Sequence, residues 1–159
     1  MSDPTSPFRL ASITLDAGEA PQQSAEIEQE RNIAIFDLLE ANAFALCDGA
    51  TGPYALRLSV QERMLIFDVT PEQSAPLRYA LPFSAFRKRA RSYFELCDTY
   101  FEAVRLRSHD EIAQLDEERK ALHNEGAEAV RGRLSDWAEI DHDTARRLFT
   151  LICSLVYRG

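Results

Sequence analysis

The sequence predicts an α+β fold in which an antiparallel meander sheet is covered on one face by three to four helices. Two observations carry this prediction. Short segments of the first half alternate apolar and polar residues, whereas the second half shows the three- and four-residue apolar spacing of amphipathic helices. The chain has 159 residues, 45% of them hydrophobic. This is the size of one compact domain with its own core, so we expect residues 1–159 to form a single domain.

Four segments of the first half have the alternation of half-buried strands. Residues 54–60 and 64–70 alternate most clearly, and the three residues between them predict a hairpin. Residues 77–83 alternate again, and residues 9–16 do so more weakly. Strands with one apolar face belong in an antiparallel sheet that is covered on that face.

The first predicted helix covers residues 25–42, with Ser24 as its N-cap. Residues 16–24 separate this helix from the first predicted strand. They include Gly18 and Pro21 among polar neighbours, a composition typical of loops. We therefore expect residues 16–24 to form a mobile loop.

Three further helices are predicted in the second half of the chain. Residues 84–107 carry apolar side chains at alternating spacings of four and three, as on the buried side of an amphipathic helix. Ser108 and Glu111 predict a capping box at the start of the next helix. The last two helices are expected at residues 109–135 and, capped by Asp141, at residues 142–157.

Charge and cysteine content limit the kinds of partner and the cellular compartment that are expected for this protein. The formal net charge of −8 argues against a whole-surface affinity for nucleic acid or anionic membranes. The most apolar segment, residues 148–157, is half as long as the ~20 residues that cross a bilayer, and the first residues show no signal peptide. Three cysteines without a CxxC unit indicate a reducing compartment, so we expect a cytoplasmic protein. Two of them, Cys97 and Cys153, lie on or beside apolar helix faces and are expected to pack in the core.

Sequence motifs for common catalytic and cofactor chemistry are absent. The chain has no HExxH, EF-hand or paired-cysteine pattern for a metal. It has no GxGxxG or P-loop for a nucleotide, and no GxSxG for a catalytic serine. We therefore expect no metal and no cofactor, and the sequence favours a protein that is not an enzyme.

Gly126 is unexpected because it lies inside a predicted helix, where glycine costs about 1 kcal/mol relative to alanine. On a helical wheel it falls near the middle of the apolar side. We interpret it as a point of close packing, where a backbone or an aromatic ring approaches the helix. His123 and Glu125 flank that side about 160° apart, so they form no acid–base pair on a regular helix.

Arg119 is the second unexpected residue because it also lies within the apolar stripe of that helix. A cation there must meet an acid or receive an anion. Two interpretations remain open. The first is structural, either an ion pair or a side chain that extends along the helix so that its charge reaches solvent. The second is an anion pocket that Arg119 forms with His123, one turn further along the helix.

A basic cluster interrupts the acidic chain at residues 86–91, with Arg87, Lys88 and Arg91 among its cations. It lies in the first turns of a predicted helix, where the helix dipole disfavours positive charge. The functional interpretation is a docking patch for phosphate, for an acidic partner, or for the acidic N-terminal third of the protein itself. The alternative is a solvated helix side. A nucleic-acid site is not favoured, because aromatic residues are not interleaved with further basic clusters.

Four segments of the chain are RNIAIFDLLE, GPYALRLS, LHNEG and DTARRLFTLIC. In this order they resemble segments of an uncharacterised protein family typical of alphaproteobacteria. The resemblance covers nearly the whole chain outside residues 16–24. It implies a small bacterial cytosolic protein and no activity, cofactor or catalytic residue.

Two hypotheses for the function follow. The first is a non-enzymatic interaction or regulatory module that acts through protein surfaces, with an unknown protein or a second copy of the chain as its partner. The second is a small enzyme or ligand-binding protein for an anionic metabolite, in which Arg119 holds the anion and His123 acts as acid and base.

Overall fold

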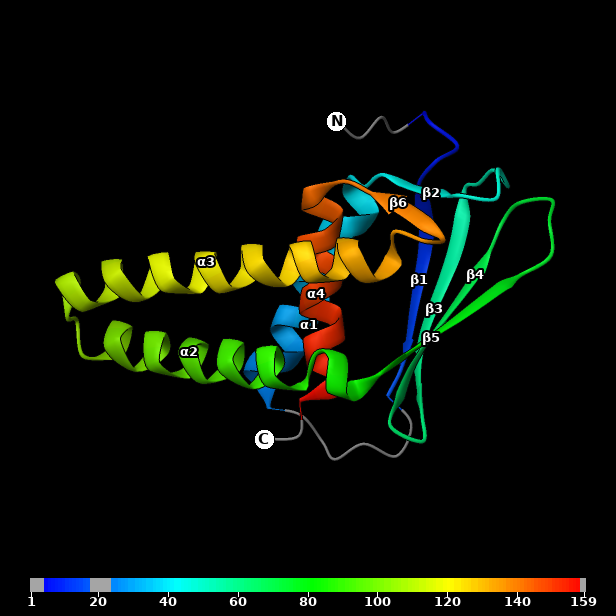
Figure 1. Cartoon of the computed structure of the whole chain (residues 1–159). Coiled ribbons are helices and arrows are strands. Elements are labelled where there is room, and N and C mark those ends of the chain that lie inside the picture. Colours follow the sequence, from blue (N-terminus) through cyan, green and yellow to red (C-terminus); the bar gives the residue numbers. More distant parts are fainter. Residues whose placement is uncertain (1–4, 18–23, 158–159) are drawn as a thin grey trace.

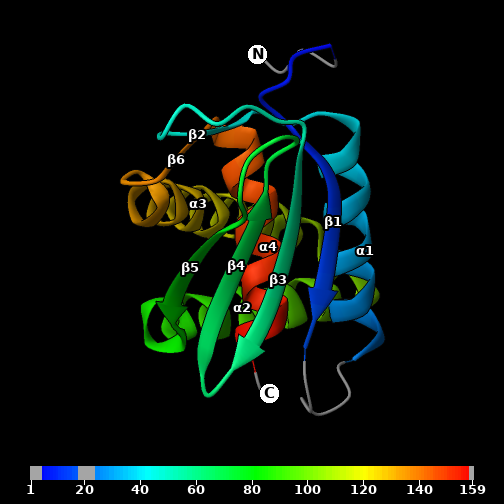
Figure 2. The same cartoon turned by 90° about the vertical axis from the view of Figure 1, so that its right-hand side faces the viewer.

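The computed structural model describes residues 5–17 and 24–157. Within them, four strands form a mixed sheet in the order β1-β3-β4-β5, and four α-helices lie on one face of it (Figures 1 and 2). The predicted α+β class is therefore confirmed. The strand bounds are β1 Leu10–Asp16, β3 Tyr54–Gln61, β4 Met64–Thr70 and β5 Leu77–Pro82.

Strand β1 runs parallel to β3, so the prediction of a purely antiparallel meander is wrong. The helix α1, Ala25–Glu40, lies between these two strands in the chain. A helical crossover returns the chain to the end of the sheet where β1 began, and the next strand then pairs in parallel. The remaining strands, β3, β4 and β5, do form an antiparallel meander.

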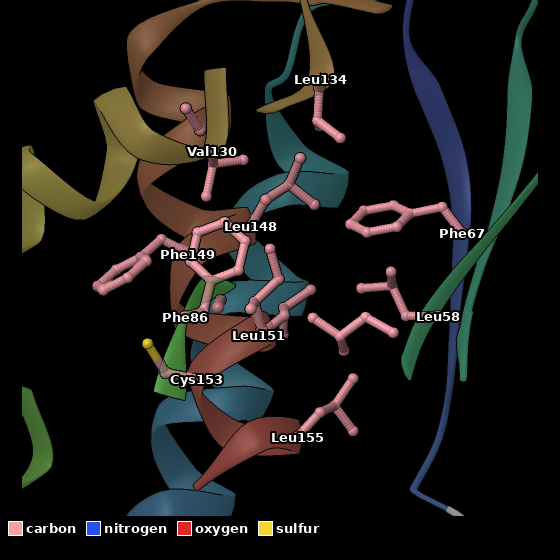
Figure 3. Packing of buried hydrophobic residues seen from close by; sticks show 14 of the residues in the cluster. Leu58, Phe67, Phe86, Val130, Leu134, Leu148, Phe149, Leu151, Cys153 and Leu155 are labelled. Atoms are coloured by element: carbon pink, nitrogen blue, oxygen red, sulfur yellow. The ribbon is translucent and has the colours of Figure 1, made fainter. Parts of the chain in front are cut away.

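The two faces of the sheet differ as the alternation predicts. Leu58 and Phe67 are cross-strand partners, are fully buried and point toward the helices (Figure 3). Side chains of the opposite, solvent-facing side form ion pairs, Arg57 with Asp16 at 2.6 Å and Arg78 with Asp68 at 2.8 Å.

A second, two-stranded sheet was not predicted. Strands β2, Phe44–Leu46, and β6, Ala138–Ile140, pair in antiparallel fashion. A strand of three residues is too short to show a reliable alternation, and its partner lies about 90 residues away in the chain. This pairing depends on tertiary contacts alone.

The remaining helices match their predicted positions within a few residues. Ser24 and Asp141 cap α1 and α4 as expected, because their side chains accept hydrogen bonds from the backbone three residues ahead. Ser108 is the N-cap of α3, but its side chain makes no capping hydrogen bond, so the predicted capping box is wrong. The chain reverses tightly there, with Arg107 at φ 57°. The bounds are α2 Arg87–Arg105, α3 His109–Leu134 and α4 His142–Val156, and a 3-10 turn, Phe83–Ala85, precedes α2.

Helix α4 is the central element of the core. It lies between the sheet and the α2–α3 pair (Figures 1 and 2), and all its residues from Thr144 to Val156 except Arg146 and Arg147 are buried. Its apolar sequence is therefore explained by burial on all sides. Within the described residues, no helix combines the length and apolarity that crossing a membrane requires.

Helices α2 and α3 form an antiparallel hairpin that projects from the body (Figure 1). Near the body, Cys97 on α2 and His123 on α3 lie close to α4. We call residues 98–122, beyond this level, the arm. At 1.5 Å per residue the arm extends about 20 Å. The predicted mobile loop at residues 16–24 lies largely outside the described residues, because residues 18–23 are not described.

Candidate functional site

Gly126 is a point of close approach between α3 and α4. A Cβ built at this position would lie 2.4 Å from the Cε1 and Cζ atoms of Phe149 on α4. Both residues are buried, and α3 continues as an unbroken helix through Gly126 (Figure 3 shows the Phe149 ring beside α3). The missing side chain therefore makes room for an aromatic ring.

His123 lies one turn before Gly126 and is held by α4. Its Nε2 is 2.9 Å from the Arg146 carbonyl oxygen and 2.9 Å from Thr150 Oγ1, and its Nδ1 is 3.3 Å from the Arg146 guanidinium. A guanidinium can only donate, so Nδ1 accepts, and Nε2–H donates to the carbonyl. Burial, and then the Arg146 charge, lower the pKa of His123 to about 4. The imidazole is therefore neutral at pH 7, and the protein uses both ring nitrogens.

Arg119 lies on the arm, with its guanidinium carbon 4.3 Å from the centroid of the Tyr100 ring. Its NH2 group is 3.3 Å from a carboxylate oxygen of Asp116, on the preceding turn of α3. The cation is therefore held by a cation–π contact, worth about 0.5–1 kcal/mol at a partly exposed site, and by an ion pair within its own helix.

Glu125 points away from His123. Its carboxylate lies 3.7 Å from the guanidinium of Arg89 on α2, whereas the imidazole of His123 faces α4. The unbroken helix thus keeps these two groups apart. In the described part of the chain, no group of three or more His, Cys, Asp or Glu side chains could hold a metal ion.

The two core cysteines are protonated thiols at neutral pH. Burial raises the pKa of Cys97 to about 11 and raises that of Cys153 well above its usual value. The third cysteine, Cys47, is exposed. Since a thiolate is the reactive form, Cys97 and Cys153 serve as core residues.

The basic cluster at the start of α2 is exposed to solvent. Arg87, Lys88 and Arg91 are all exposed, and the first turn of α2 contains no acidic residue. Within the described part of the chain, Arg89 of this segment pairs with Glu125, while the other three cations form no ion pair. The structure does not bring the cluster together with Arg119 and His123, which lie further along the hairpin.

The side of α1 that points away from α4 is apolar as well. Ile33, Phe36 and Leu39 are 52%, 63% and 45% exposed. We call this surface, with its acidic neighbours Glu26, Asp37 and Glu40, the α1 outer face. Figure 2 shows α1 at one lateral edge of the molecule, and none of the elements within residues 5–17 and 24–157 packs on its outer side. A groove of about 410 Å³ runs along this side and is lined by Ala25, Glu28, Gln29, Asn32, Ile33 and Phe36.

The end of the arm exposes a second apolar set. Phe101 is 39%, Val104 45% and Leu106 69% exposed. The first two continue the apolar stripe of α2, which packs on α4 near the body. We call these three residues the arm tip.

Comparison with known proteins gives a family and no activity. Residues 7–158 match the model of the "Uncharacterised protein family (UPF0262)". The chain belongs to the UPF0262 family. A UPF0262 protein of Paracoccus denitrificans is 45% identical over 154 residues, which cover 93% of this chain and 95% of the relative. One from Caulobacter vibrioides is 44% identical, with 99% of each chain covered, and no solved structure matches.

These UPF0262 chains confirm the resemblance noted in the sequence. Their matches extend over the α1 outer face, the basic cluster and the arm, so none of these features lies in a segment outside the family match. The comparisons assign no ligand, partner or reaction to any of them.

The α1 outer face was not predicted from the sequence. A signal was present: apolar residues at positions 33–36 and 38–39 occupy nearly every direction around this helix instead of one stripe. Such a helix is either buried on all sides or covered by a partner on one of them. Only the tertiary structure shows that α1, unlike α4, has an uncovered apolar side.

Proposed function

We propose that this UPF0262 protein is a non-enzymatic interaction module that binds a protein partner through the α1 outer face. The exposed ring of Phe36 carries the proposal, because it lies with Ile33 and Leu39 on a helix side that the fold itself does not use. The inner side of α1 already supplies Ile27, Ala34 and Leu38 to the core. An apolar patch flanked by charged residues is typical of a protein–protein contact surface.

The charges of α1 indicate the chemistry of the partner. The helix carries five carboxylates and one cation, Arg31, a net charge of −4. Arg31 is turned inward, where its Nε donates to Ser154 Oγ at 3.1 Å. The outward charges are therefore all negative, and a partner that presents apolar side chains beside Arg or Lys is favoured.

Catalysis by His123 and Arg119 receives less support. A general base needs a free nitrogen within reach of a substrate proton, and both ring nitrogens of His123 have partners in the protein. An anion at Arg119 would have to compete with Asp116 and Tyr100. The free cysteines agree with a reducing compartment, and we place the protein in the cytoplasm.

Photo-crosslinking in living cells tests the proposal. Phe36 is replaced by the photoreactive analogue benzoylphenylalanine, and exposed Ala80, on strand β5, is replaced in a matched control. We expect illumination to give a discrete protein adduct from position 36 and none from position 80. Absence of any adduct from position 36 in the native organism would refute the proposed function.

A further inference from the structure

We propose that the partner of the α1 outer face is a second copy of this chain, whose arm lies across α1 in a reciprocal dimer. The inference rests on the proposed function and names its partner. The arm tip of each copy would lie beside Phe36 of the other copy. The arm tip of one chain would thus cover the α1 outer face of the second chain, and the reverse.

Within the described residues, the fold leaves two large apolar surfaces uncovered. The α1 outer face and the arm tip each expose three large hydrophobic side chains. They belong to different elements, and the arm projects away from the body that contains α1 (Figure 1). A short two-helix segment gains little stability from helix propensity alone, so the arm benefits from a surface that covers Phe101, Val104 and Leu106.

The two surfaces are also complementary in charge. Helix α2 carries five cations and three carboxylates, a net charge of +2, against −4 for α1. At 100° per residue the exposed side chains of Arg87, Arg91, Phe101 and Arg105 fall within a sector of about 80°, which also holds the exposed carboxylate of Asp98 and so carries a net charge of +2. That sector combines an aromatic ring with guanidinium groups, which is the chemistry that the acidic, apolar α1 outer face favours.

The acidic neighbours on α1 are placed to receive these cations. Glu26, Asp37 and Glu40 fall within about 60° of one another around Ile33. Two copies that met through α1 alone would bring these carboxylates together, and like charges repel. An α1–α2 contact avoids the repulsion and gives the basic cluster a partner in the acidic N-terminal third of the second chain.

Two-fold symmetry makes the arrangement closed. When α1 of one chain contacts α2 of the other, the symmetry operation repeats the contact with the roles exchanged, and no surface remains for further growth. A standard interface buries about 800 Å² per partner. Because the contact occurs twice, each α1–α2 contact has to bury only about 400 Å² per chain.

The mass of the purified full chain in solution tests the inference. Light scattering after gel filtration at about 100 µM should give twice the chain mass of 18.0 kDa. We expect Phe36→Glu and Phe101→Glu each to weaken self-association at least tenfold, because each would bury a carboxylate in an apolar contact. Ala80→Glu is the matched control and should remain dimeric. Since the wild-type rings at positions 36 and 101 are exposed, circular dichroism should show all three variants folded.

Charge reversal tests the pairing itself. With Phe101 beside Phe36 and the two helices parallel, the rise of about 1.5 Å per residue brings Arg91 level with Glu26 and Arg105 level with Glu40. Glu26→Arg with Glu40→Arg, and separately Arg91→Glu with Arg105→Glu, should each weaken the dimer at least tenfold. All four substitutions in one chain should restore association to within a few-fold of wild type, because the opposed charges are again of opposite sign. Added NaCl should weaken the wild-type dimer.

Three results would overturn the inference: a monomeric wild-type chain, a dimer that Phe36→Glu leaves intact, or four reversals that associate no better than two. The crosslinking experiment separates these from failure of the proposed function. An adduct from position 36 with a different protein refutes only the second copy as partner, whereas no adduct refutes the proposed function as well.

Discussion

Replacing Gly126 with alanine should destabilise the protein, although alanine is the better helix former. The added Cβ would lie 2.4 Å from the Phe149 ring, well inside van der Waals contact. Phe149 cannot retreat freely, because the rings of His123 and Tyr93 lie 5.8 Å and 5.9 Å from it, centroid to centroid. The overlap must therefore be relieved by separating α3 from α4 or by moving several buried rings.

The expected magnitude follows from two opposing contributions. Alanine in place of glycine gains about 1 kcal/mol in a helix interior. Overpacking a filled core costs about 1–3 kcal/mol, and the tight overlap with an enclosed ring places Gly126→Ala at the upper end of that range. The net loss of unfolding free energy should be about 1–2 kcal/mol.

Gly132, on the same helix, provides the matched control. A Cβ there meets nothing within 4 Å, so Gly132→Ala should gain about 0.5–1 kcal/mol. Urea denaturation followed by circular dichroism at 222 nm measures both variants. Thermal midpoints should shift by about 2–4 °C for each kcal/mol, downward for Gly126→Ala and upward for Gly132→Ala.

Equal stabilisation by the two alanine substitutions would refute the reasoning, since it would mean that the Phe149 ring does not constrain position 126. A double-mutant cycle gives a sharper test. Phe149→Leu alone should destabilise by leaving a cavity. In the Gly126→Ala background, Phe149→Leu should lower the free energy of unfolding by less, because the methyl group added at position 126 occupies part of the space that the Phe149 ring leaves.

Three further predictions concern other parts of the fold. The pKa of His123 is about 4 in the folded protein and 6.5 in the unfolded chain, so the folded state binds fewer protons between these values. The free energy of unfolding should therefore fall, by at most ~3 kcal/mol, as the pH drops from 6.5 to 4. Urea denaturation at several pH values measures this dependence, and His123→Gln should remove it. Replacing Arg87, Lys88 and Arg91 with glutamate should leave the free energy of unfolding of the dilute protein within ~0.5 kcal/mol of the wild-type value. The same variant should no longer capture the partner in a pull-down. An unchanged set of captured proteins would count against docking at this cluster. Asp141→Ala should cost about 1 kcal/mol in thermal melts through loss of the α4 cap, and no loss would contradict the capping role.

Local sequence signals predicted the helices and all four strands of the larger sheet, because those signals depend on neighbours a few residues apart. Ser24 and Asp141 mark helix starts through hydrogen bonds that span three residues. The alternation in residues 54–60 and 64–70 assigned the inner and outer sides of β3 and β4. The predicted capping box at Ser108 failed because a tight reversal of the chain, which the local pattern does not contain, sets the backbone there.

Features that depend on distant pairing could not be predicted in the same way. The parallel alignment of β1 with β3 follows from the path of α1 across the sheet, and the β2–β6 pair joins segments about 90 residues apart. The α1 outer face likewise combines a feature that the sequence shows with one that depends on the tertiary structure. The apolar residues of α1 are visible in the sequence, but which of its sides the core covers depends on where α4 lies.

The sequence by itself determined the α+β class, the positions of the long helices and the need for close packing at Gly126, because hydrophobic period and glycine cost are local properties of the chain. The tertiary structure alone decided that Phe149 fills that space, that the nitrogens of His123 are taken up by α4, and that the α1 outer face and arm tip remain uncovered. These depend on how elements distant in sequence are arranged, and burial is a property of that arrangement.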